Sequence, residues 1–178
     1  MTIMRVIKQH LGVFCTLLAI VTISGLGAVV VGARTAVPYL VLPSAVGTTS
    51  FIPPLRLIPL GRGALDYWLI DVIGVAVLFV VALLHLSHSA RKYPHPTRAR
   101  SFRVAFTATF FALIAANVSR ALLMSVLTDS SLGAYAGFMV GTIVISIVAG
   151  FGLGFITGTV AAISRHKRSE TEPELAEV

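Results

Sequence analysis

The sequence is poor in cysteine and in charge of either sign. Its 178 residues include one cysteine, Cys15, and charged residues make up 12% of the chain. A single thiol cannot form an internal disulfide, which excludes a fold held by such bonds. Of the seven acidic residues, only Asp66, Asp71 and Asp129 lie outside the last ten positions.

Catalytic motifs are lacking as well. The chain has no phosphate-binding glycine loop with a lysine, no His-Glu-x-x-His zinc motif and no nucleophile elbow. Asp66 and Asp71 are five residues apart, a spacing that puts them on different faces of a helix and disfavours a catalytic carboxylate pair. We therefore expect no enzymatic activity and no cofactor.

Apolar residues are abundant instead. They make up 56% of the chain, and the mean hydropathy is +0.92, whereas a soluble domain is roughly 45–50% apolar. Four runs reach the roughly 20 residues needed to cross a bilayer: Leu11 to Ala33, Tyr67 to Ser87, Phe102 to Leu127 and Leu132 to Ser164. Because backbone polar groups in lipid need internal partners, residues 1–168 are predicted to form an all-α integral membrane four-helix bundle. The acidic tail, residues 169–178, is predicted to be flexible.

The lengths of the first and last runs carry further expectations. The first holds 23 residues, more than the roughly 7–15 of a signal peptide's apolar core, so we expect a retained helix. The fourth holds 33 residues and would be about 50 Å long. We expect it to tilt, kink or project beyond a hydrocarbon core of about 30 Å.

Basic residues are concentrated on one side of the predicted topology. Ten Lys and Arg residues lie before the first helix, in or beside the middle connection, or after the fourth helix. The first outer loop holds three. This asymmetry predicts a multi-pass protein of the cell membrane with both termini in the cytoplasm. It also argues against a nucleic-acid partner, despite the net charge of +7. The middle connection carries Arg91, Lys92, Arg98 and Arg100, which we interpret as contacts to lipid head groups or as a docking site for an acidic partner.

The long extracytoplasmic loop, from Arg34 to Asp66, is rich in proline and in apolar residues. Its prolines prevent a long helix; they are Pro38, Pro43, Pro53, Pro54 and Pro59. A loop of this composition is not an ordinary solvated one. It is expected to lie on the membrane interface, to fold back over the bundle, or to be covered by another protein.

Two charged residues, Asp71 and Arg120, fall inside the predicted spans. Such residues are expensive in a bilayer and are functional candidates by default. Both are expected in the outer half, where a salt bridge between them is feasible and Asn117 would complete a polar pocket. The alternative is that they reach the nearby interface, or pair only to hold the bundle together. Towards the cytoplasm the polar residues reduce to hydroxyls such as Thr107 and Thr109.

All five histidines are expected at the cytoplasmic side. His85 and His88 share a helix face and are the candidate metal ligands, together with His95 or a partner. No cysteine or carboxylate is near them in the sequence, so no metal site is predicted.

Glycine recurs at every fourth position of the fourth predicted helix. Residues at this spacing share one face, where missing side chains let another helix approach closely. They are Gly133, Gly137 and Gly141, followed by Gly150, Gly154 and Gly158. We expect this face to pack against the first helix, at Gly25, Ala28 and Gly32, with an intermolecular interface as the alternative.

These features favour a role in helix packing and in association with other proteins. We expect an accessory or scaffolding subunit of a larger membrane complex, with the lipid bilayer and other membrane subunits or further copies of itself as partners. The alternative is a small transporter or channel, acting as a single chain or as a homo-oligomer, with Asp71 and Arg120 in its polar pocket. A third hypothesis is a regulator whose basic loop binds a soluble protein.

Overall fold

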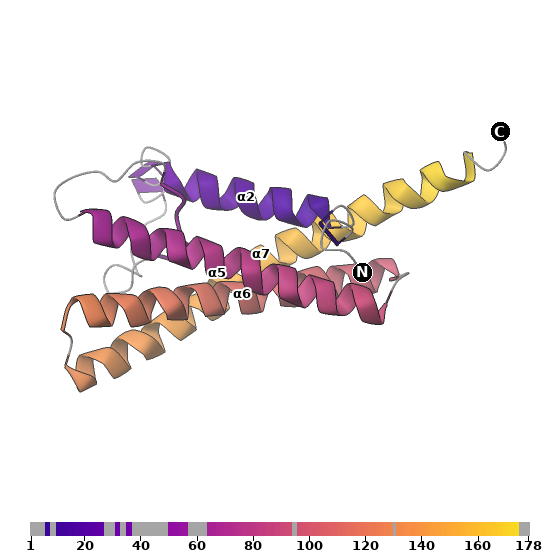
Figure 1. Cartoon of the computed structure of the whole chain (residues 1–178). Coiled ribbons are helices and arrows are strands. Elements are labelled where there is room, and N and C mark those ends of the chain that lie inside the picture. Colours follow the sequence, from indigo (N-terminus) through magenta and orange to yellow (C-terminus); the bar gives the residue numbers. More distant parts are fainter. Residues whose placement is uncertain are drawn as a thin grey trace.

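The computed structural model describes residues 6–7, 10–26, 31–32, 35–36, 50–56, 64–93, 96–129 and 131–174. The regular secondary structure of these residues is helical, and four long elements form a bundle (Figure 1). They are α2 (Leu11–Gly25), α5 (Ala64–Lys92), α6 (Arg98–Leu127) and α7 (Leu132–Glu174). The fold class predicted from the sequence is confirmed to this extent.

Three stretches of these helices are long and apolar enough to cross a membrane. They are Leu65–Lys92, Arg98–Leu127 and Leu132–Arg165, which supports membrane association. Helix α2 is apolar but has 15 residues, about 22 Å at 1.5 Å per residue. The predicted continuous helix from 11 to 33 is therefore wrong at Leu26, where the backbone becomes extended. Residues 27–30 and 33 lie outside the described part.

Helix α2 ends where a distant part of the chain crosses it. A Cβ built on Gly25 would overlap the carbonyl group of Leu55, so only glycine fits at this crossing. The Leu55 backbone N–H donates to the Val21 carbonyl over 3.1 Å. Because this contact is made by residues about thirty positions further along the chain, the apolar run alone gives no sign of it.

Helix α7 is longer than its apolar run. It begins after Ser131, whose side chain accepts from the Ala134 backbone N–H and caps the helix. It ends at Glu174 after 43 residues, inside the tail predicted to be flexible; residues 175–178 lie outside the described part. The helix crosses the bundle obliquely, and its C-terminal end runs past the other helices (Figure 1).

Helix α6 packs along both α5 and α7, and α2 packs against α7. The face of α6 inside the bundle consists largely of alanine, which lets its neighbours approach closely. Buried apolar residues of α2 and α5 belong to the same core cluster. The core includes Ala105, Ala108, Ala112 and Ala116 of α6, Val13, Leu17 and Val21 of α2, and Leu78, Ala82 and Leu86 of α5.

Phenylalanines and glycines fix the register between α6 and α7. Three phenylalanines of α6 at four-residue spacing lie against three glycines of α7, in antiparallel order. A Cβ on Gly158 would lie 2.8 Å from Phe102 Cδ2 and 3.1 Å from the Phe102 carbonyl oxygen. Phe151 and Phe155 of α7 meet the same rings edge-on, with centroids 5.3–5.7 Å apart. The pairs are Phe102 with Gly158, Phe106 with Gly154 and Phe110 with Gly150.

The predicted partner of these glycines was therefore wrong. Gly150, Gly154 and Gly158 face α6, not the first helix, because rings on α6 recur at the same spacing. The α2–α7 contact is made elsewhere, where a Cβ on Gly12 would lie 3.0 Å from Ser164 Oγ. At the other end of α7, a Cβ on Gly133 or Gly137 would meet no atom within 4 Å.

This register predicts opposite effects for two glycines of one helix. Gly158→Ala should lower the free energy of unfolding by about 1–3 kcal/mol, because its Cβ enters the space of Phe102. Gly152→Ala is the matched control, since a Cβ there meets no atom within 4 Å; it should be neutral or stabilising by up to about 1 kcal/mol. Denaturant titration in detergent measures both, and equal stability of the two variants would contradict the register.

Candidate functional site

An ion pair joins α5 to α6 inside the bundle. Arg120 Nε donates to Asp71 Oδ1 over 3.1 Å, and Nη2 donates to the same oxygen. Arg120 is 1% exposed and Asp71 8%. The structure thus brings together the two charged residues that the sequence places in the spans, and Arg120 points inward instead of reaching the interface.

The stem of Arg120 needs a gap in the opposite helix. Gly74 provides this gap, one turn after Asp71 on the same face of α5. A Cβ on Gly74 would lie 2.6 Å from Arg120 Cγ and would overlap Cδ. Asp71 therefore pairs with the charge of Arg120, and Gly74 leaves room for the methylene groups of the same side chain.

Asn117 links the ion pair to α7 and to a non-helical segment. Its Oδ1 accepts from Arg120 Nη1 over 3.1 Å. Its Nδ2 donates to Ser146 Oγ of α7 over 3.0 Å and to the Phe51 carbonyl oxygen over 3.1 Å. Ser146 in turn donates to the Thr142 carbonyl, so its oxygen is available to accept from Asn117. The Asn117 amide thus uses its NH2 group as donor and its oxygen as acceptor.

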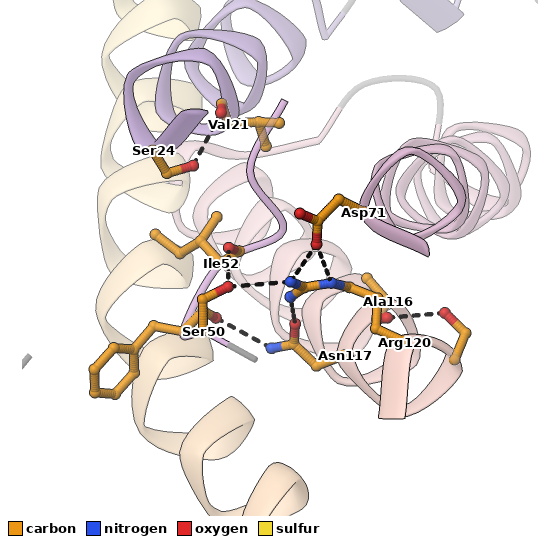
Figure 2. Close-up of polar contacts among 10 residues, drawn as sticks. Val21, Ser24, Ser50, Ile52, Asp71, Ala116, Asn117 and Arg120 are labelled. Carbon is orange, nitrogen blue, oxygen red and sulfur yellow. Dashed lines mark hydrogen bonds and ion pairs between the residues drawn. The ribbon is translucent and has the colours of Figure 1, made fainter. Parts of the chain in front are cut away.

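Residues 50–56 lie among the helices and complete this network. Figure 2 shows Ser50 and Ile52 beside Arg120 and Asn117, with Asp71 on the other side of the guanidinium. Arg120 Nη2 donates to Ser50 Oγ over 3.2 Å, and Ser50 donates to the Ile52 carbonyl. At the far end of the segment, Trp68 Nε1 donates to the Arg56 carbonyl over 2.7 Å.

Two prolines suit this segment to a buried position. Pro53 and Pro54 are both buried and neither has a backbone N–H. A non-helical backbone inside a membrane bundle must have every polar group satisfied, and proline removes one donor per residue. Of the three alternatives for the outer loop, residues 50–56 therefore follow the second, folding back into the bundle. The rest of that loop, including Pro38, Pro43 and Pro59, lies outside the described residues.

Further polar contacts lie towards the other end of the helices. Thr109 Oγ1 of α6 and Thr157 Oγ1 of α7 are 2.8 Å apart, and both residues are buried. His85 Nε2 of α5 lies 3.1 Å from Thr107 Oγ1. Because Thr107 donates its own proton to a backbone carbonyl, the imidazole is the donor in that contact. These hydroxyls thus tie α6 to both of its neighbours.

The described histidines lie at the start of α2, in α5 and in α7. Among the described residues, no three of His, Cys, Asp and Glu are grouped closely enough to hold a metal ion, and His95 lies outside that part of the chain. His88 is exposed. Burial, and to a lesser extent the charge of Arg165, lowers the pKa of His10 to about 4. This imidazole, at the start of α2, is therefore neutral at pH 7.

The basic residues of the middle connection lie at the turn between α5 and α6. Their side chains are exposed; they are Arg91, Lys92, Arg98 and Arg100. Tyr93 stands among them, with Arg100 Cζ 4.0 Å and Lys92 Nζ 5.6 Å from its ring centroid.

Two parts of the buried network were missed from the sequence. A glycine one turn from the acid of an apolar helix was the available signal for Gly74. Ser50 gave none, because its contact depends on the return of a long loop.

Comparison of the chain with protein-family models, curated proteins and solved structures finds no match.

The ion pair predicts strongly non-additive effects of substitution. Asp71→Leu or Arg120→Met alone should lower stability by about 3–5 kcal/mol, because each leaves a buried partner uncompensated. The double variant Asp71→Leu/Arg120→Met should cost less than the sum, about 1–3 kcal/mol, since it leaves only the Asn117 and Ser50 acceptors unpaired. Unfolding in detergent provides the double-mutant cycle.

The exposed Asp66, in the first turn of α5, supplies the control for charge alone. Asp66→Asn should change stability by less than about 1 kcal/mol. Additive effects of the two buried substitutions would contradict the pairing of Asp71 with Arg120.

Proposed function

We propose that the chain is a multi-pass protein of the cell membrane that serves as an accessory or scaffolding subunit of a larger complex. In this proposal both termini and the α5–α6 turn are cytoplasmic, and the proline-rich loop is extracytoplasmic. The excess of Lys and Arg in the connections assigned to the cytoplasm supports this orientation.

The observation that carries the proposal is the internal use of the intramembrane polar groups. Arg120 donates to Asp71, Asn117 and Ser50, and Asn117 donates to α7 and to residues 50–56. These bonds hold four segments of the chain in one arrangement. Groups engaged in this way support a rigid scaffold better than a site that must release a substrate.

The outer surface of α7 supplies a face on which another helix would fit. Gly133 and Gly137 are open, as described above, and valines continue the exposed surface. Van der Waals packing drives helix association in lipid, and small residues permit close approach. The valines are Val140, Val144 and Val148, each more than half exposed.

The subunit proposal predicts that the chain is isolated with other proteins. Extraction in mild detergent at native expression, followed by gel filtration and mass spectrometry, should recover it in an assembly with constant partners. Gly137→Leu should weaken that assembly by about tenfold or more through loss of close packing and leave the fold intact, because its position is open. The exposed Ala136, next along the helix, gives the control Ala136→Leu. Migration as a lone monomer would contradict the proposal.

A small transporter or channel is the second candidate, and one observation favours it. A buried ion pair lies beside non-helical backbone among helices long enough to cross a membrane, as in many solute pathways. This hypothesis predicts flux in reconstituted vesicles that Asp71→Asn reduces by about tenfold or more while the protein remains folded. Flux equal to that of empty vesicles across several ions and solutes would count against it.

A further inference from the structure

The turn between α5 and α6 gathers positive charge around one aromatic ring. Tyr93 follows the last residue of α5, and its N–H donates to the Ser89 carbonyl. Arg100 Cζ, from α6, lies 4.0 Å from the ring centroid, and Lys92 Nζ, from α5, lies 5.6 Å from it. Each cation is attracted by the ring, yet the two cations repel each other.

The start of α6 adds to this unfavourable electrostatics. Thr97 caps the helix by accepting from the Arg100 N–H. The N-terminus of a helix carries partial positive charge and is stabilised by acidic residues. The first turn of α6 has none and carries Arg98 and Arg100 instead, and Arg103 is exposed one turn on.

The described carboxylates lie far from Lys92 and Arg100. Asp66 and Asp71 lie near the start of α5, and Asp129 follows the end of α6. Each is therefore at the opposite end of a helix of 29 or 30 residues, roughly 40 Å in length. Among the residues whose side chains the structure describes, no carboxylate therefore lies near the Tyr93 ring and its two cations, Lys92 and Arg100.

The position of the turn indicates which anion would balance it. Lys92 and Arg98 end the two stretches long and apolar enough to cross a membrane, so the turn lies at the depth of the lipid head groups. Tyrosine is typical of that depth because its ring is apolar and its hydroxyl is polar. Anionic lipid attracts basic residues there.

We propose that the α5–α6 turn binds the phosphate of an anionic phospholipid between Lys92 and Arg100. Tyr93 is a positioning residue: its ring holds the guanidinium of Arg100, whose N–H groups form a fork suited to two phosphate oxygens. The bound phosphate relieves the repulsion between the two cations, beside the positive end of the α6 dipole. This site is independent of the subunit function proposed above.

Native mass spectrometry of the full chain, freed of lipid and titrated with defined lipids, tests the site. Phosphatidylglycerol should bind at least about tenfold more tightly than phosphatidylcholine. Arg100→Gln and Lys92→Gln should each weaken phosphatidylglycerol binding about fivefold, the effect of one basic residue at an anionic surface. Arg91→Gln is the matched control, with the same loss of charge at an exposed position of the same turn, and should change binding by less than about twofold.

Substitutions of the ring separate positioning from charge. Tyr93→Leu leaves every charge in place and should still weaken phosphatidylglycerol binding by about twofold to fivefold, because Arg100 loses its support. Tyr93→Phe retains the ring and should bind as the unsubstituted protein does. Thermal unfolding of each variant establishes that it is folded. If Arg100→Gln does not fold, the phosphatidylglycerol affinity of Lys92→Gln tests the site in its place.

Three outcomes would overturn the proposal. Equal affinity for the two lipids would show that head-group charge is not recognised. An effect of Arg91→Gln as large as that of Arg100→Gln would show diffuse attraction in place of a site. Displacement of the lipid by an equal concentration of inorganic phosphate would show that a soluble phosphate is the ligand.

Discussion

A guanidinium inside a bundle of apolar helices needs an acceptor for each donor that it directs inward. The part of the fold around Arg120 is arranged to provide these acceptors. Asp71 on α5 supplies the charge, Asn117 supplies an amide oxygen from α6, and Ser50 supplies a hydroxyl from the returning loop. Removing an arginine from water costs more than any one such contact returns. The position of α5, the path of residues 50–56 and the glycine at position 74 are therefore mutually dependent.

This dependence extends to α2, which does not touch the ion pair. Residues 50–56 pass from Arg120 to the end of α2, where Leu55 bonds to the Val21 carbonyl and occupies the space that a side chain on residue 25 would need. The loop is thus fixed at one end by a charged network and at the other by backbone contact. Both contacts join residues that are distant in the sequence. The crossing at Leu55 explains why α2 ends at Gly25 although the sequence beyond it is apolar.

The sequence predicted the elements better than their partners. Apolar runs revealed α5, α6 and α7 because length and composition suffice for such helices, and the pairing of Asp71 with Arg120 followed from counting along those runs. The partner of Gly150, Gly154 and Gly158 was not found, because the phenylalanines of α6 were not compared with the glycines of α7. Matching two series of equal spacing on neighbouring antiparallel helices would have given the register. The network around Ser50 depends on a loop closure that no local pattern encodes.

Helix α6 shows two ways of placing arginine in a membrane protein. Arg120 lies deep in the bundle, where its own chain must supply every acceptor, and the result is a fixed structure. Arg98 and Arg100 lie at the N-terminal end of the same helix, where the helix dipole already disfavours positive charge. Under the lipid-binding proposal, head-group phosphate supplies the anion that Arg100 contacts there. Burial thus determines which arginines must be satisfied from within and which are left for the surroundings to complete.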